Sequence, residues 1–201
     1  MVAPAVGVLL VDDHPAVRRG LQAMLESEPG LDPVATAAAS RDALALVEEI
    51  RPGVCLIDYH LPDEDGLWLC LRLKALEHPP RVLMYSAFAD ELLALLAQVC
   101  GVDGLVSKAA FADELCDALR SVADGCTVLP PTSPATMESA LSGLDTDDLP
   151  IVGMLVHGTP PAEIATTLGM EESWVLARRW AIAERIRGRP PGRSHAGQPV
   201  R

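Results

Sequence analysis

Five side chains that carry oxygen or ammonium groups stand at or just after the ends of short apolar runs: Asp12, Asp13, Asp58, Ser86 and Lys108. Apolar runs of this length, bounded by turn residues, are typical of strands buried on both faces of a parallel sheet. The carboxyl ends of parallel strands meet along one edge, where open α/β sheets bind their ligands. We therefore expect these distant residues to form one site.

The residue types of this site point to phosphoryl transfer. Three carboxylates in one pocket repel each other, and a hard divalent cation such as Mg²⁺ relieves that repulsion while keeping room for phosphate oxygens. Lys108 adds a mobile positive charge that suits a phosphoryl group, and the Ser86 hydroxyl can donate a hydrogen bond to it. The set predicts a site in which Asp58 attacks a phosphorus atom while the cation and the lysine stabilise negative charge.

The elements that position these residues alternate regularly. Strands are predicted over residues 6–11, 31–37, 54–58, 81–86 and 104–107, and helical patterns follow each of them. Pro15 suits the first turn of the first helix, and Ser40 is expected to cap the second. Alternation of this kind predicts βαβ units. The fold class is therefore α/β, a flavodoxin-like (βα)5 doubly wound parallel sheet, followed by a small all-α helix-turn-helix domain.

These motifs, in this order, resemble a bacterial two-component response regulator of the NarL/FixJ type. Residues 1–126 resemble its receiver domain, through V-D-D-H at Val11–His14, I-D-Y-H-L-P-D-E-D-G at Ile57–Gly66, S-A at Ser86-Ala87, and Lys108. The resemblance implies that a sensor histidine kinase phosphorylates the chain. The roles it implies are phosphoacceptor for Asp58, phosphoryl-oxygen contacts for Ser86 and Lys108, and Mg²⁺ ligands for Asp12, Asp13, Asp58 and the backbone carbonyl of His60.

Two positions depart from the receiver pattern. Leu105 stands three residues before the lysine, where the family usually has an aromatic switch residue. Phe88 stands two residues past Ser86, where it either shields the phosphoryl group or packs on the following helix.

Three other functions compete with this interpretation. One is a flavodoxin-like domain without phosphoryl chemistry. Another is a haloacid dehalogenase-type phosphatase, which has a second acid where this chain has His60, so we do not expect an enzyme. The third is a regulator that is not phosphorylated, which the intact Asp58, Ser86 and Lys108 disfavour.

The C-terminal third is predicted to contain a second domain. Residues 127–143 read as a Pro-rich, partly extended linker, residues 144–188 resemble a divergent LuxR-type helix-turn-helix, and residues 189–201 read as a basic disordered tail. Thr159 is expected to cap a helix that begins at Pro160, and Gly169 to make the turn before a recognition helix over residues 173–187.

The resemblance implies DNA binding through the recognition helix, with Arg178, Arg179 and Arg185 as predicted contacts. However, Trp174 and Leu176 replace the threonine and lysine that the family places there, and the family's fourth helix is not visible. The alternative is a degenerate output domain that acts as a protein-interaction module.

Composition limits the location of the protein and its partners. The net charge is −12, although residues 171–201 carry seven Arg against three Glu, so any nucleic-acid contact is expected at that end. Five cysteines without a metal or disulfide pattern indicate free thiols in a reducing compartment. No run is long enough for a membrane span. We expect a cytoplasmic protein, with a homodimer among its assemblies.

Overall fold

The structure is a computed structural model that describes residues 5–188, so the predicted basic tail at 189–201 lies outside the described residues. It contains two compact units, which divide between Ser133 and Pro134. Within residues 5–188, no helix is both long and apolar enough to cross a membrane.

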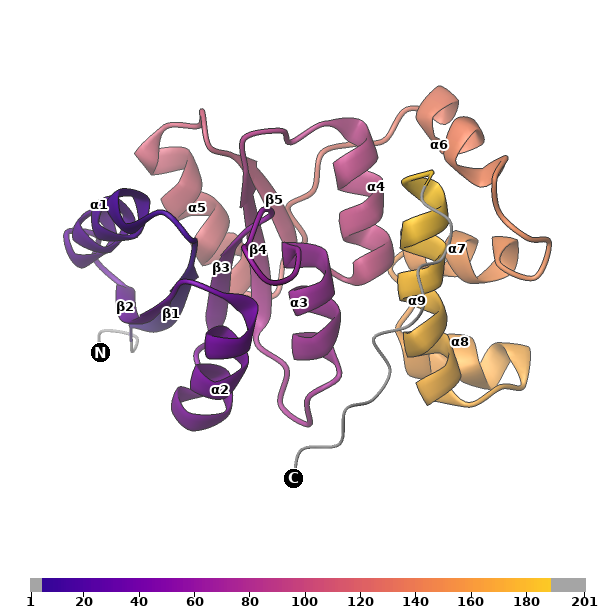
Figure 1. The fold of residues 1–201 in the computed structure, drawn as a ribbon, viewed down its shortest axis with the longest axis horizontal. Coiled ribbons are helices and arrows are strands. Elements are labelled where there is room, and N and C mark those ends of the chain that lie inside the picture. The colour runs from indigo at the N-terminus through magenta and orange to yellow at the C-terminus, as the bar shows by residue number, and fades with distance from the viewer. Residues whose placement is uncertain (1–4, 189–201) are drawn as a thin grey trace. The chain divides into compact units, whose positions relative to one another are not determined.

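The first unit is built on a five-stranded parallel sheet (Figure 1). Its strands are β1 (Val6–Val11), β2 (Leu31–Ala37), β3 (Val54–Asp58), β4 (Arg81–Ser86) and β5 (Gly104–Ser107). Their order across the sheet is β2-β1-β3-β4-β5, with β3 wholly buried. This is the predicted flavodoxin-like arrangement, and every predicted strand is confirmed.

Helices cover both faces of this sheet (Figure 1). They are α1 (Pro15–Glu26), α2 (Ser40–Ile50), α3 (Gly66–Lys74), α4 (Glu91–Cys100) and α5 (Ala112–Ala123). Apolar side chains of α1 and α5 share one core cluster with β1, β3, β4 and β5, whereas α2, α3 and α4 pack side by side on the opposite face. The two layers hold the carboxyl edge of the sheet in place because each strand is packed on both sides.

The cap of α2 differs from the prediction. Ser40 is the first helical residue rather than the cap, and Ala39 precedes the helix without a side-chain bond. Instead, the carboxylate of Asp63 accepts hydrogen bonds from the backbone N–H groups of Ser40 (2.9 Å) and Arg41 (3.1 Å). The loop after β3 therefore supplies an acceptor for backbone N–H groups that have no partner within the helix. No local sequence pattern reveals such a long-range cap.

These bonds also set the ionisation of Asp63. Partial burial by itself would raise the pKa of the carboxyl group, but the backbone N–H groups of Ser40, Arg41 and Glu64 hold it below its usual value.

The second unit is helical. It contains α6 (Pro134–Leu141), α7 (Leu149–Val156), α8 (Pro161–Leu168) and α9 (Glu172–Ile186). The predicted linker is not extended throughout, because α6 forms over Pro134–Leu141, where the sequence allows a turn of helix at residues 137–141. A helix can begin at Pro134 because proline is accepted in the first turn.

The start of α8 also corrects a prediction. Pro160, not Thr159, is the capping residue, and the helix begins at Pro161. The backbone of Pro160 is extended, with φ −62° and ψ 147°, because a residue that precedes a proline is disfavoured in the helical region.

Candidate functional site

The carboxyl ends of β1, β3 and β5 bring three of the predicted residues into direct contact. The Nζ atom of Lys108 lies 2.8 Å from Oδ2 of Asp12 and 2.7 Å from Oδ2 of Asp58. Asp12 is 2% exposed and Asp58 5% exposed. Two buried carboxylates thus share one ammonium group, which offsets part of the charge repulsion between them.

The lysine is held in its charged form. Burial alone would lower the pKa of Lys108, but the hydrogen bonds and the charges of Asp12 and Asp58 outweigh it and raise the pKa above its usual value. The site therefore carries a fixed positive charge next to Asp58 at neutral pH.

Asp13 completes an acidic cluster. Carboxylate oxygens of Asp12, Asp13 and Asp58 and a ring nitrogen of His14 lie within 4.8 Å of one another. No described group donates a hydrogen bond to the buried Oδ1 atom of Asp13, although Nδ1 of His14 lies 2.5 Å away and would pair with it when protonated. Carboxylate oxygens are hard ligands, and three carboxylates this close together fit a hard divalent cation.

Ser86 lies at the same edge of the sheet, at the end of β4. Its side chain is buried, and its Oγ atom accepts a hydrogen bond from the backbone N–H of Phe88 (3.1 Å). Its backbone carbonyl accepts from the backbone N–H of Lys108 (2.8 Å). The fold therefore places Ser86 at the same edge as Asp12, Asp13, Asp58 and Lys108.

The two departures from the receiver pattern have different environments. Phe88 is 70% exposed, so most of its ring lies open at the surface. Leu105 is buried, and as a leucine it has no aromatic ring with which to act as the family's switch residue.

The loop between Asp58 and α3 depends on Gly66. A Cβ atom at residue 66 would lie 2.5 Å from the backbone oxygen of Asp58, while the N–H of Gly66 donates to the carbonyl of Tyr59 (2.8 Å). Only glycine permits this close approach of the two backbones. Asp65 then caps α3 by accepting from the N–H of Trp68 (2.9 Å).

Two further residues contact the site without a sequence signal that would have marked them. Arg18 on α1 donates through Nη1 to the backbone carbonyl of Asp12 (2.5 Å). Tyr85 on β4 donates its hydroxyl to the backbone carbonyl of Lys108 (3.4 Å). Burial, first of all, and the nearby carboxylates raise the pKa of Tyr85 despite the opposing charge of Lys108, so its phenol is neutral and can donate.

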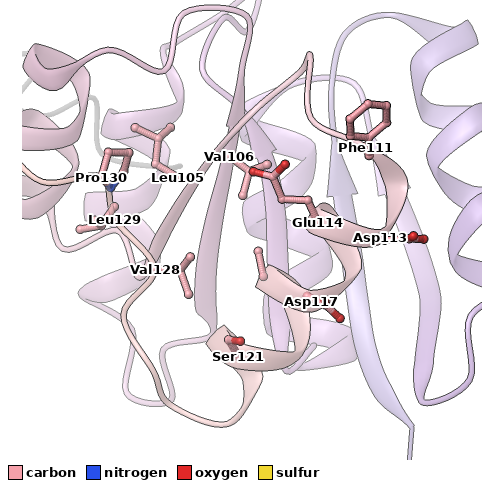
Figure 2. A pocket seen from close by; sticks show the side chains of 11 residues that line it. Leu105, Val106, Phe111, Asp113, Glu114, Asp117, Ser121, Val128, Leu129 and Pro130 are labelled. Carbon is pink, nitrogen blue, oxygen red and sulfur yellow. The ribbon is translucent and has the colours of Figure 1, made fainter.

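A separate hollow of about 740 Å³ lies between α5 and the segment that follows it (Figure 2). It is lined by residues such as Leu105, Phe111, Glu114, Val128 and Pro130. None of its lining residues belongs to the acidic cluster, so this hollow is distinct from the candidate site.

In the second unit, α8 and α9 form a helix-turn-helix. Gly169 makes the turn with a φ of 67°, in the left-handed region. Arg179, the third of the predicted DNA contacts, is 4% exposed and lies in the core of this unit, so its charge is not presented to a DNA backbone.

The other two predicted DNA contacts are tied to acidic residues within this unit. Arg178 donates to Asp148 (2.5 Å), and Arg185 donates to Asp148 (2.8 Å) and to Asp145. Asp148 is wholly buried. These pairs fix α9 against the segment before α7, and they compete with any contact that the two arginines make to phosphate.

Comparisons with known proteins agree with this architecture. Residues 8–120 match the response regulator receiver domain family. The chain is 32% identical to the DNA-binding transcriptional activator DevR/DosR of Mycobacterium tuberculosis, over 93% of this chain and 98% of that protein. It is 34% identical to the transcriptional activator protein ExaE of Pseudomonas putida, over 81% of each chain.

A solved structure is similar as well. The crystal structure of a LuxR-family two-component response regulator from a species of Aurantimonas matches with a TM-score of 0.60 and 30% identity, over 63% of this chain and 91% of that one. The protein is thus a receiver-containing signalling protein by fold and motif. It belongs to the response regulators, and the prediction of a NarL/FixJ-type member is confirmed.

Proposed function

We propose that the protein accepts a phosphoryl group on Asp58 from a sensor histidine kinase and regulates transcription through its helix-turn-helix. The observation that carries the first step is the Lys108 ammonium group between the carboxylates of Asp12 and Asp58. An oxygen of Asp58 forms the new bond to phosphorus while the bond from phosphorus to the kinase histidine breaks. Lys108 then turns toward the phosphoryl oxygens, and the hydroxyl group of Ser86 donates a hydrogen bond to one of them.

Asp12, Asp13 and Asp58, with the backbone carbonyl of His60, would hold Mg²⁺. The bound cation supplies charge neutralisation around the phosphoryl group. This assignment rests on the clustered carboxylate oxygens of Asp12, Asp13 and Asp58.

The DNA-binding step rests on the helix-turn-helix formed by α8 and α9, with Gly169 at the turn, and on the similarity to DevR/DosR, which is named as a DNA-binding transcriptional activator. In such a motif the second helix enters the major groove. We assign the contacts to α9, with Arg178 and Arg185 reaching phosphate when they leave their acidic partners. A cytoplasmic homodimer is the assembly we propose.

The test is a DNA pull-down followed by sequencing, performed with and without a small-molecule phosphodonor and Mg²⁺. Wild-type protein is expected to enrich a defined DNA site only after phosphorylation, and Asp58→Asn is expected to enrich none. Binding should weaken steeply as salt rises. Phosphorylation of Asp58→Asn to the wild-type level would contradict the assignment of the phosphoacceptor.

A second candidate function is a protein-interaction module in place of DNA binding. It is favoured by the ion pairs that Arg178 and Arg185 make with Asp148, by buried Arg179, and by Trp174, which is 43% exposed on α9. If the pull-down shows only sequence-blind, salt-sensitive binding that the phosphodonor leaves unchanged, this candidate is preferred.

A further inference from the structure

Tyr85 contacts Lys108 in two ways. Its ring centroid lies 5.6 Å from the Nζ atom of Lys108, within the range in which an ammonium group is attracted to an aromatic face. Its hydroxyl donates to the backbone carbonyl of the same lysine, at 3.4 Å. One side chain therefore contacts both ends of the residue that neutralises Asp58.

The position of Tyr85 in its strand decides which helices it can affect. Side chains alternate between the two faces of a sheet, so Tyr85 shares a face with Leu83, two residues earlier in β4. Both belong to the core formed with α1 and α5, which includes Val106 of β5 and Leu115 of α5. Leu105 adjoins Val106 in sequence and therefore points to the opposite face, where α4 packs on β5.

The aromatic contact to the lysine thus lies on the α1–α5 face, while the buried residue on the other face, Leu105, offers neither a ring nor a hydroxyl group. A displacement of Lys108 would change the environment of Tyr85 directly. The ring of Tyr85 packs against the same core as α5, so a shift of the ring is transmitted to that helix.

We infer that Tyr85 is a positioning residue for Lys108 and that it conveys the displacement of Lys108 on phosphorylation to the α1–α5 face of the sheet. This inference rests on the proposed phosphorylation of Asp58. The ring holds the ammonium group over the Asp12–Asp58 pair. When Lys108 moves on phosphorylation, this contact is lost and the ring of Tyr85 shifts.

The first test measures how fast the full-length protein takes up phosphoryl groups from phosphoramidate in the presence of Mg²⁺. Because the contact is made by the unphosphorylated lysine and is lost when the lysine moves, Tyr85→Leu is expected to speed the uptake about two- to fivefold, which corresponds to the loss of a cation–π contact of about 0.5–1 kcal/mol. Tyr85→Phe keeps the ring and should stay close to the wild-type rate. Equal rates for wild type, Tyr85→Leu and Tyr85→Phe would overturn the positioning role.

A double-mutant cycle separates this role from simple packing. Tyr85→Leu, Lys108→Met and their combination are compared in the free energy of unfolding by urea, without Mg²⁺. Tyr85→Leu is expected to be less costly when Lys108 is already replaced, whereas a residue that only packs would cost the same in both backgrounds. Additive effects would reject the contact.

The second test uses hydrogen exchange followed by mass spectrometry. Phosphorylated wild type is expected to change the exchange of backbone amides in α5 (Ala112–Ala123), and Tyr85→Leu at equal phosphorylation should lose at least half of that change. An unchanged response in Tyr85→Leu would reject the transmission. If wild-type protein takes up no phosphoryl group, the proposed function itself fails, and the urea cycle still decides whether Tyr85 holds Lys108.

Discussion

The Nζ atom of Lys108 lies 2.7 Å from Oδ2 of Asp58, although fifty residues separate them in the sequence. The same nitrogen lies 2.8 Å from Asp12. In the absence of a cation, this lysine is the group that offsets the two buried carboxylates, so the stability of the first unit should depend on it.

Lys108→Met is expected to lower the free energy of unfolding by about 1–3 kcal/mol in a chelating buffer, because it leaves buried charged groups without their partner. The combined variant Asp58→Asn/Lys108→Met should lose less, since one of the carboxylates is then neutral. Urea unfolding of the three proteins checks this. An equal loss in the single and combined variants would show that the lysine does not act through Asp58.

Mg²⁺ is expected to stabilise the protein through the acidic cluster. At ten times its dissociation constant, the cation should raise the free energy of unfolding by about 1.4 kcal/mol relative to a chelating buffer. Asp13→Asn should weaken this effect, because Asp13 contributes oxygens to the cluster. Asp63→Asn is the matched control, since Asp63 lies outside the cluster and should leave the Mg²⁺ dependence unchanged. Calorimetric titration measures the Mg²⁺ affinity of Asp13→Asn and of Asp63→Asn.

Asp63→Ala is expected to destabilise the first unit by about 1 kcal/mol near pH 6, because the carboxylate caps α2 from a distant loop. The pKa of Asp63 is lowered by folding, so its contribution is complete above the unfolded pKa of about 3.9 and is lost as the pH falls through the lower folded value. The difference between wild type and Asp63→Ala should therefore shrink below about pH 4. Asp63→Asn, which keeps one acceptor oxygen, should lie between them. Urea titrations at pH 6 and pH 3.5 provide the measurement, and a difference that grows with acidity would contradict this account.

Asp148→Asn is expected to weaken the attachment of α9 to the segment before α7 in the second unit. Asp148 is wholly buried and accepts from both Arg178 and Arg185. Removing its charge should cost about 1–3 kcal/mol, less than a fully buried pair because both arginines are partly exposed. The same change frees the arginines, so sequence-independent DNA affinity at low salt should rise. Glu163→Gln, on α8, is a control for the change in net charge. If affinity rises equally in both variants, the pairs with Asp148 do not restrain the arginines.

One cysteine should react quickly with a thiol reagent in the native protein. All five cysteines are free, and Cys126 is exposed while Cys55, Cys70, Cys100 and Cys116 are buried. A colorimetric thiol assay is expected to detect about one fast equivalent in native protein and five in denaturant, and Cys126→Ser should remove the fast one. A second fast equivalent in the variant would indicate that a buried cysteine opens readily.

The sequence determined the fold and the residues of the candidate site because both depend on local patterns. Short apolar runs define the strands, and a parallel sheet must bring their carboxyl ends together. The positions of Asp12, Asp58, Ser86 and Lys108 at one edge follow from that geometry. Arg179 is different, because it was predicted as a DNA contact and is buried in α9 together with Val175, Ile182 and Ile186.

Only the tertiary structure decided which groups those residues contact. The cap of α2 comes from Asp63, 23 residues beyond the start of that helix, so no local capping pattern marks it. The sequence suggests that Arg178 and Arg185 are free to contact DNA. In the fold, however, both side chains pair with buried Asp148, which lies about thirty or more residues earlier in the chain. Tyr85 shows no periodic signal of its role, because its contact with Lys108 exists only once β4 and β5 pair. Such contacts depend on the three-dimensional path of the chain, which hydrophobic periodicity does not specify.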